Sequence, residues 1–225
     1  MNASANQLAQ LIRDRSLLLL DFDGPVCSVF AGYPARSIAS ELRQMTGVNT
    51  TDFNDENDPL RLLMRLSRVA RPEVTQMVAN ALREKEILAI ETAMPTPGSA
   101  ELIRAARASG RQIAIVSNNS IGAIHAYLAS HGLASSIDHV SARYDGMNPA
   151  RLKPDAELLR RALAATGVAP DRAIFIGDSL SDVAAGTASN IHTIGYANRR
   201  SKKDALRAAG AVNVVEDLMQ IVVAL

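Results

Sequence analysis

The sequence predicts an α/β protein whose core is a doubly wound parallel β-sheet, with a helical insert after the first strand. Short apolar runs that end in Gly, Ser, Asn or Asp alternate with helical patterns, as expected when helices join buried parallel strands. One long segment, between residues 24 and 97, breaks this alternation and contains helical patterns without a convincing strand. These two observations define the fold class and the domain organisation.

The elements of the core follow in chain order. Residues 1–16 have the pattern of a polar amphipathic helix. Four apolar runs indicate buried strands, and a weaker fifth run lies near the end of the chain: Leu17–Phe22, Gln112–Val116, Ala173–Ile176, Ile191–Ile194 and Val212–Val215. Helical patterns lie between and after these runs, at Ser99–Ala108, Ile121–His131, Ala156–Thr166, Asp182–Ser189 and Asp217–Ala224.

The insert is predicted to be all-helical. Its helical patterns cover Ala35–Met45, Leu60–Val69 and Glu73–Ile90. A segment of this length is too long for a loop in a compact domain, and Gly and Pro residues punctuate both of its stems. We therefore expect a core domain formed by residues 1–26 and 94–225, and a helical cap formed by residues 27–93.

Composition and charge exclude several classes of protein. The chain of 225 residues has 24 basic and 23 acidic residues, so it has no charge excess for binding nucleic acid or an anionic membrane. The longest early apolar run, Leu17–Leu20, is far too short to span a membrane. The single cysteine, Cys27, excludes an intrachain disulfide and fits a reducing compartment. We expect a cytoplasmic protein that binds neither nucleic acid nor membranes.

The polar residues that could carry chemistry follow the predicted strands. Ligands of open α/β sheets bind outside the carboxyl ends of the strands. Three strand ends and one loop supply these side chains: Asp21, Asp23, Ser117, Asp178, Asp182 and, in the loop, Lys153. Four carboxylates, one hydroxyl group and one lysine are therefore expected to meet at one edge of the sheet.

This set of groups suits phosphoryl chemistry. Clustered carboxylates repel one another unless a cation lies between them, and oxygen ligands without His or Cys favour Mg²⁺. A bound Mg²⁺ attracts phosphate oxygens, and a lysine and a hydroxyl group donate to the same oxygens. A further carboxylate is then available as a nucleophile or as an acid and base.

Four segments resemble the motifs of the haloacid dehalogenase-like hydrolase superfamily. They are Leu17–Val26 (LLLLDFDGPV), Ile115–Asn119 (IVSNN), Leu152–Pro154 (LKP) and Ile176–Asp182 (IGDSLSD), and they occur in the family's order over nearly the whole chain. The insert between the first and second motifs resembles the helical cap of subfamily I. The resemblance implies a Rossmann-like core and a Mg²⁺-dependent phosphatase that acts on a small phosphorylated metabolite through an aspartyl-phosphate intermediate.

The resemblance also implies a role for each carboxylate. Asp21 would be the nucleophile, and Asp23 would be the general acid and then the base. Asp21, Asp178 and the backbone carbonyl of Asp23 would hold Mg²⁺, and Asp182 would be a further ligand or would orient the others. Because Asp23 is present, the sequence looks like a phosphatase rather than a C–Cl-cleaving dehalogenase. Pro25 departs from the family pattern, where Thr or Val is commoner, but removes no reacting group.

The remaining site residues would contact the phosphoryl group. By the same resemblance, Ser117 would donate a hydrogen bond to it, Asn118 would bind it, and Lys153 would neutralise the charge between nucleophile and phosphate. In the insert, Arg61, Arg65 and Arg68 lie at helical spacing, where they form either a solvated face or a contact for a substrate anion.

Three other functions are compatible with parts of this pattern. A phosphomutase of the β-phosphoglucomutase type shares the motifs and the cap, and passes the phosphoryl group to a sugar instead of water. A phospho-acceptor signalling domain also uses Asp, Mg²⁺, a hydroxyl group and Lys, but it has no insert after the first strand. A catalytically inactive binding protein would not need the intact set of polar groups.

Overall fold

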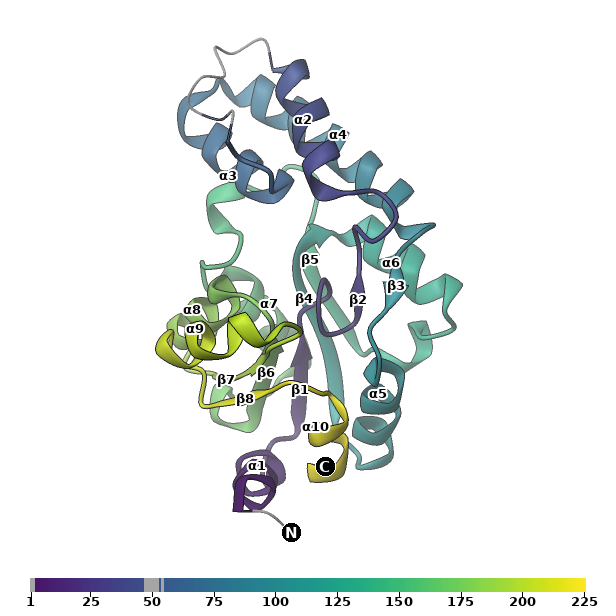
Figure 1. The fold of residues 1–225 in the computed structure, drawn as a ribbon, viewed down its shortest axis with the longest axis vertical. Coiled ribbons are helices and arrows are strands. Elements are labelled where there is room, and N and C mark those ends of the chain that lie inside the picture. The colour runs from purple at the N-terminus through teal and green to yellow at the C-terminus, as the bar shows by residue number, and fades with distance from the viewer. Residues whose placement is uncertain (1–2, 47–52, 54) are drawn as a thin grey trace.

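The computed structural model describes residues 3–46, 53 and 55–225, and its centre is a six-stranded parallel sheet (Figure 1). The strand order is β5-β4-β1-β6-β7-β8. The strands are β1 (Leu17–Leu20), β4 (Gln112–Ser120), β5 (His139–Arg143), β6 (Ala173–Gly177), β7 (His192–Tyr196) and β8 (Asn213–Val215). This is the predicted doubly wound α/β sheet.

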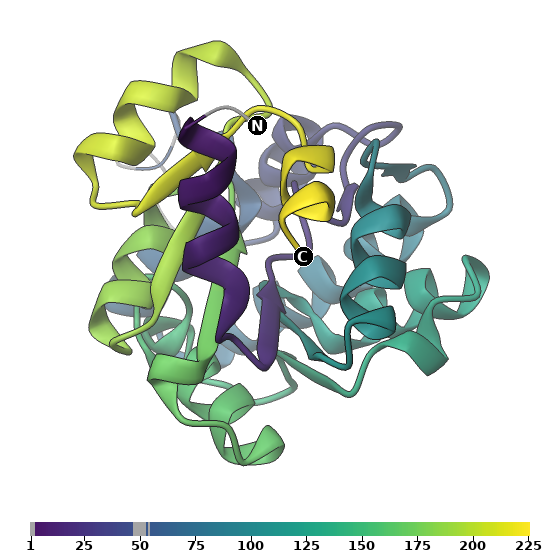
Figure 2. The ribbon, with the colours of Figure 1, turned by 90° about the horizontal axis from the view of Figure 1, so that it is seen from below.

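Helices cover both faces of the sheet, as the view from below shows (Figure 2). Leu18 and Leu20 of β1 face one core cluster, to which α1 (Ala3–Arg13), α5 (Ser99–Ala108), α6 (Ile121–Ser130) and α10 (Met219–Ala224) contribute. Leu17 and Leu19 face a second cluster, formed with α7 (Glu157–Thr166) and α8 (Leu180–Ala188). Burial on both faces explains why the central strand is continuously apolar instead of alternating.

The insert contributes three helices at one end of the molecule (Figure 1): α2 (Ala35–Met45), α3 (Pro59–Val69) and α4 (Pro72–Ile90). They share an apolar cluster of their own, which includes Ile38, Leu42, Leu62, Leu66 and Leu82. Asp58 caps the start of α3 by accepting hydrogen bonds from the N–H groups of Leu60 and Arg61. No helix in the described part of the chain is long and apolar enough to cross a membrane.

The structure contains elements that the sequence pattern did not predict. β2 (Cys27–Ser28) pairs antiparallel with β3 (Met94–Pro95), so a short two-stranded sheet joins the stems of the insert outside the main sheet. β5 was missed because its sequence, HVSAR, is polar and lies at the sheet edge. The short helix α9 (Lys203–Ala208), which packs next to α8, was also missed.

Candidate active site

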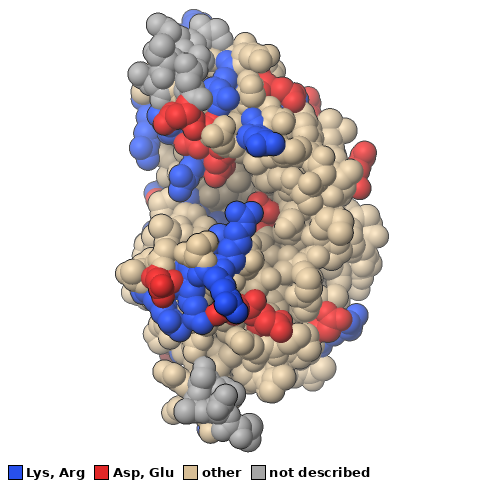
Figure 3. Space-filling model, viewed as in Figure 1, with Lys and Arg blue, Asp and Glu red and all other residues tan. Residues whose placement is uncertain are grey.

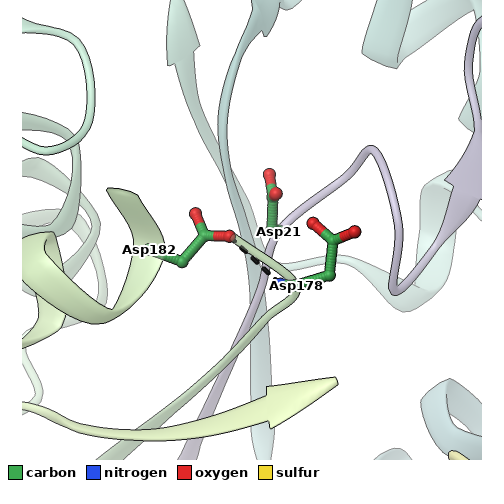
Figure 4. Close-up of side chains that lie close together, drawn as sticks. All are labelled: Asp21, Asp178 and Asp182. Atoms are coloured by element: carbon green, nitrogen blue, oxygen red, sulfur yellow. Dashed lines mark hydrogen bonds between the residues drawn. The ribbon is translucent and has the colours of Figure 1, made fainter. Parts of the chain in front are cut away.

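The topology brings three predicted strand ends together. β1 pairs with β4 on one side and with β6 on the other, with Leu20 opposite Ile115 and Ile176. Asp21 follows β1, Ser117 lies within β4, and Asp178 follows β6. The carboxylates of Asp21, Asp178 and Asp182 consequently lie next to one another (Figure 4).

Asp21 is nearly buried, and its two carboxylate oxygens differ in their surroundings. Oδ1 accepts a hydrogen bond of 2.7 Å from the N–H of Phe22 and lies 2.8 Å from Nζ of Lys153. Within the described residues Oδ2 accepts no hydrogen bond, and Asp21 lines a cavity between the core and the insert. Burial raises the pKa of Asp21 well above its ordinary value, Asp182 raises it further, and Lys153 opposes both effects.

Lys153 forms ion pairs with two of the carboxylates. Its Nζ lies 2.7 Å from Oδ1 of Asp182 as well as 2.8 Å from Asp21, and it donates to the carbonyl oxygen of Val116. Burial lowers the pKa of Lys153, but Asp182 and Asp21 outweigh it and raise that pKa above its usual range. The lysine is therefore charged, and it partly offsets the repulsion between the two acids.

Asn118 lines the cavity, but it directs both ends of its amide to the backbone of Lys153. Its Oδ1 accepts from the Lys153 N–H at 2.8 Å, and its Nδ2 donates to the Lys153 carbonyl at 3.0 Å. In this structure Asn118 therefore fixes the loop that presents Lys153.

The two carboxylate oxygens of Asp182 contact different groups. Its Oδ2 accepts hydrogen bonds from the N–H groups of Asp178 and Ser179 and from the Ser179 hydroxyl, and Ser179 in turn accepts from the Asp182 N–H. This reciprocal capping box starts α8. Its other oxygen pairs with Lys153, so all of its strong contacts are made inside the protein.

The three clustered acids fit a hard divalent cation. One carboxylate oxygen from each of Asp21, Asp178 and Asp182 can be chosen so that all lie within 4.8 Å of one another. Every donor is an oxygen, which is the ligand type that Mg²⁺ prefers. Burial raises the pKa of Asp178, while Lys202, which pairs with its Oδ2, lowers it. Gly24 leaves room for this carboxylate, because a Cβ there would lie 2.5 Å from Cγ of Asp178.

Asp23 lines the same cavity without joining the cluster. Its Oδ1 accepts a hydrogen bond of 2.9 Å from the N–H of Val29. Burial raises the pKa of Asp23 to about 7, although the Val29 hydrogen bond lowers it. A carboxyl group with such a pKa can both give and take a proton near neutral pH.

A buried network behind Ser117 was not predicted from the sequence. The Ser117 hydroxyl donates to Oδ1 of Asn119 at 3.1 Å, and Nδ2 of Asn119 donates to Glu86 of α4 at 3.1 Å. Glu86 also accepts from the N–H of Ser120 and pairs with Arg143 of β5. The available signal was Asn119 itself, which follows Ser117 in the second motif. Glu86 and Arg143 looked like ordinary charges in the sequence.

Core and insert together line this cavity, which has a volume of about 800 Å³. The carboxylates, Ser117 and Lys153 lie on the core side, and α3 contributes Leu60, Arg61 and Met64. Both basic and acidic side chains border a hollow between the insert and the rest of the molecule (Figure 3). All seven residues singled out from the motifs therefore line one cavity: Asp21, Asp23, Ser117, Asn118, Lys153, Asp178 and Asp182.

Comparisons with known proteins agree with this architecture. The sequence model of the haloacid dehalogenase-like hydrolases matches residues 17–190. A phosphoglycolate phosphatase from Rhodospirillum rubrum is 31% identical over 125 residues, which are 56% of this chain and 50% of that protein. The chain thus spans about half the length of the curated relatives it matches.

Two solved structures show the same fold. A putative haloacid dehalogenase-like hydrolase from Bacteroides fragilis superposes with a TM-score of 0.74 at 17% identity, over 92% of this chain and 99% of that one. A mutant of CbbY from Rhodobacter sphaeroides, in complex with xylulose-(1,5)bisphosphate, superposes with a TM-score of 0.64 at 21% identity, over 91% of this chain and 95% of that one.

Proposed function

The chain belongs to the haloacid dehalogenase-like hydrolases, and we propose that it hydrolyses phosphate monoesters of small metabolites with Mg²⁺, through an aspartyl-phosphate on Asp21. One observation carries the proposal. Asp21 has one carboxylate oxygen held by Phe22 and Lys153 and the other free of hydrogen bonds within the described residues. A nucleophile requires such an oriented oxygen with an available lone pair. The names of the phosphatase relatives support the same reaction class.

The reaction then needs two proton transfers, which we assign to Asp23. The free oxygen of Asp21 attacks phosphorus, the bond from phosphorus to the ester oxygen breaks, and Asp23 gives its proton to that leaving oxygen. Water next attacks the phosphorus of the aspartyl-phosphate, Asp23 takes the water proton, and phosphate and the Asp21 carboxylate are released. The pKa of about 7 for Asp23 suits both transfers.

The acidic cluster supports a magnesium site. We assign the ligands to Asp21, Asp178 and the backbone carbonyl of Asp23; Mg²⁺ held there would neutralise negative charge on the transferring phosphoryl group. Asp182 is better suited to orienting than to ligation, because one oxygen caps α8 and the other pairs with Lys153.

Three further polar residues serve the phosphoryl group in this proposal. Ser117 donates a hydrogen bond to its oxygens, and Lys153 balances the charge that Asp21 and the phosphate bring together. Asn118 acts through Lys153, since both ends of its amide hold the Lys153 backbone.

We also propose that the core and the insert have different functions. Residues 1–26 and 94–225 form the core that performs the chemistry, and residues 27–93 form a cap that contacts the leaving group. The separate apolar cluster of α2, α3 and α4 supports this division. A cytoplasmic location fits the single cysteine, Cys27, which is buried and unpaired.

Acid-quenched mass spectrometry tests the proposal. After mixing with a phosphate monoester and Mg²⁺, the protein should carry a phosphoryl group on the peptide that contains Asp21. Asp21→Asn should abolish both this label and turnover, and excess EDTA should abolish turnover of the parent enzyme. A label on Ser117, or full activity in EDTA, would contradict the assignment.

A further inference from the structure

We propose that Arg61 of the insert and Arg199 of the core bind a second anionic group of the substrate. The substrate is then a phosphate monoester whose leaving group carries a carboxylate or a second phosphate. This inference rests on the proposed phosphatase activity and names the substrate class that the cavity selects. It begins from the distribution of positive charge around the cavity.

Two of the four basic residues that line the cavity are held in close ion pairs with carboxylates. Lys153 lies between Asp21 and Asp182, and Lys202 pairs with Asp178. The other two, Arg61 and Arg199, lie in different parts of the chain, one in α3 and one after β7. Arg61 lies 4.0 Å from Asp58 and Arg199 has no ion pair with a described residue, so these two are the lining basic groups most available to a substrate.

The side chain of Arg199 is exposed and makes no hydrogen bond or ion pair with any described residue, although the backbone carbonyl of Arg199 accepts from the N–H of Lys202. Its sequence neighbours behave differently. Arg200 and Lys203 both pair with Glu216, and none of these three residues lines the cavity. The charge of Arg199 is therefore unpaired and faces the space in which a substrate would lie.

Arg61 is the member of the α3 arginine row that lines the cavity. Its nearest carboxylate is Asp58, at 4.0 Å, and one oxygen of Asp58 is used to cap α3. Asp58 also lines the cavity and would repel an anion, so the attraction of the anion by Arg61 has to exceed its repulsion by Asp58. Arg65, by contrast, lies over the ring of Phe53 and pairs with Glu56.

The dimensions and lining of the cavity fit a small, doubly anionic molecule. Its volume of about 800 Å³ is typical of metabolite sites and exceeds what a phosphoryl group alone requires. Leu60 and Met64 supply apolar surface beside Arg61, which suits a short carbon chain between two charges. A guanidinium group binds carboxylates and phosphates through paired hydrogen bonds.

A set of matched substrates tests the inference. Ethyl phosphate and 2-phosphoglycolate have the same number of carbons, but only the second carries a carboxylate, and a sugar bisphosphate carries a second phosphate. The readout is the ratio of kcat/KM for each doubly anionic substrate to that for ethyl phosphate. The variants Arg61→Gln and Arg199→Gln each remove one positive charge, and Arg199→Lys keeps the positive charge at position 199. Arg68→Gln and Arg200→Gln are controls on the same two segments, outside the cavity.

The parent enzyme should prefer at least one doubly anionic substrate over ethyl phosphate. Loss of either arginine should lower that ratio about tenfold, as expected for one charge-assisted hydrogen bond, mainly through KM. Arg199→Lys should restore part of the preference, and the control variants should retain it. The favoured substrate identifies the second anion as carboxylate or phosphate.

Two results would overturn the inference while leaving the proposed function intact: a parent enzyme that prefers ethyl phosphate, or ratios that remain unchanged in both Gln variants. A parent enzyme that hydrolyses none of these esters would instead contradict the proposed function. Circular dichroism of each variant checks that the fold is retained, which the exposure of both arginines leads us to expect.

Discussion

Replacing Glu86 with Gln should lower the free energy of unfolding by about 3–5 kcal/mol, because the change leaves a buried guanidinium group without its counter-ion. Glu86 is 0% exposed and Arg143 is 5% exposed, so water cannot reach the unpaired guanidinium group to solvate it. The carboxylate of Glu86 also accepts hydrogen bonds from Asn119 and Ser120. A glutamine places an NH₂ group against one of these donors, which adds an unsatisfied pair to the unpaired charge.

Urea unfolding measures the effect. With an m-value of about 2–3 kcal/mol/M, a loss of about 4 kcal/mol lowers the midpoint by about 1.5 M urea. Glu84→Gln is the matched control, since it makes the same chemical change at an exposed position of α4 and should alter stability by less than about 0.5 kcal/mol.

A double-mutant cycle separates the ion pair from general damage to the core. Arg143→Gln alone should also be strongly destabilising, but adding it to Glu86→Gln should cost much less than it does in the parent protein. The reasoning would be refuted if the destabilisation of the double variant equalled the sum of the two single-variant values to within about 0.5 kcal/mol. A Glu86→Gln variant as stable as Glu84→Gln would refute it as well.

Three further predictions concern the proposed reaction. Asn119→Ala removes the group that accepts the Ser117 hydrogen bond, so kcat should fall about tenfold in steady-state assays with KM little changed; an unchanged kcat would exclude a positioning role. Gly24→Ala places a Cβ against Asp178 at a φ of +127°, and it should raise the Mg²⁺ concentration for half-maximal activity about tenfold; an unaltered Mg²⁺ titration would count against Asp178 as a ligand. Asp23→Asn should slow turnover about a hundred- to ten-thousand-fold and accumulate phosphoenzyme with p-nitrophenyl phosphate, visible as a burst; slow turnover without a burst would assign Asp23 elsewhere.

The sequence contained enough information for five of the six strands of the core sheet and for the sheet edge at which the candidate residues meet. The four consecutive leucines of β1 are apolar because both faces of that strand are covered, and this pattern is visible locally. The polar residues after β1 and β6 could be located because parallel strands end at the same edge of a sheet.

Features that depend on contacts between distant residues could not be predicted in this way. Arg143 ends an edge strand whose sequence is polar, and its charge is balanced by Glu86, which lies in the insert. Nothing in the local sequence of α4 distinguishes Glu86 from its exposed neighbour Glu84. The hydrogen bonds of Asn118 could not be predicted for the same reason, because its partner is the backbone of Lys153, in a loop after β5.

The helices α4 and α3 of the insert are attached to the core by contacts of different kinds. Arg143 holds this helix at two points about two turns apart, the carbonyl of Ala79 and the carboxylate of Glu86. A helix fixed at two points cannot pivot about either one. Met64 of α3, which lines the cavity, meets the core through apolar packing against a cluster that includes Met147 and Leu152. Parting such packing costs less than breaking a buried ion pair, so the contact of α4 with the core should persist under conditions that separate the Met64 contact.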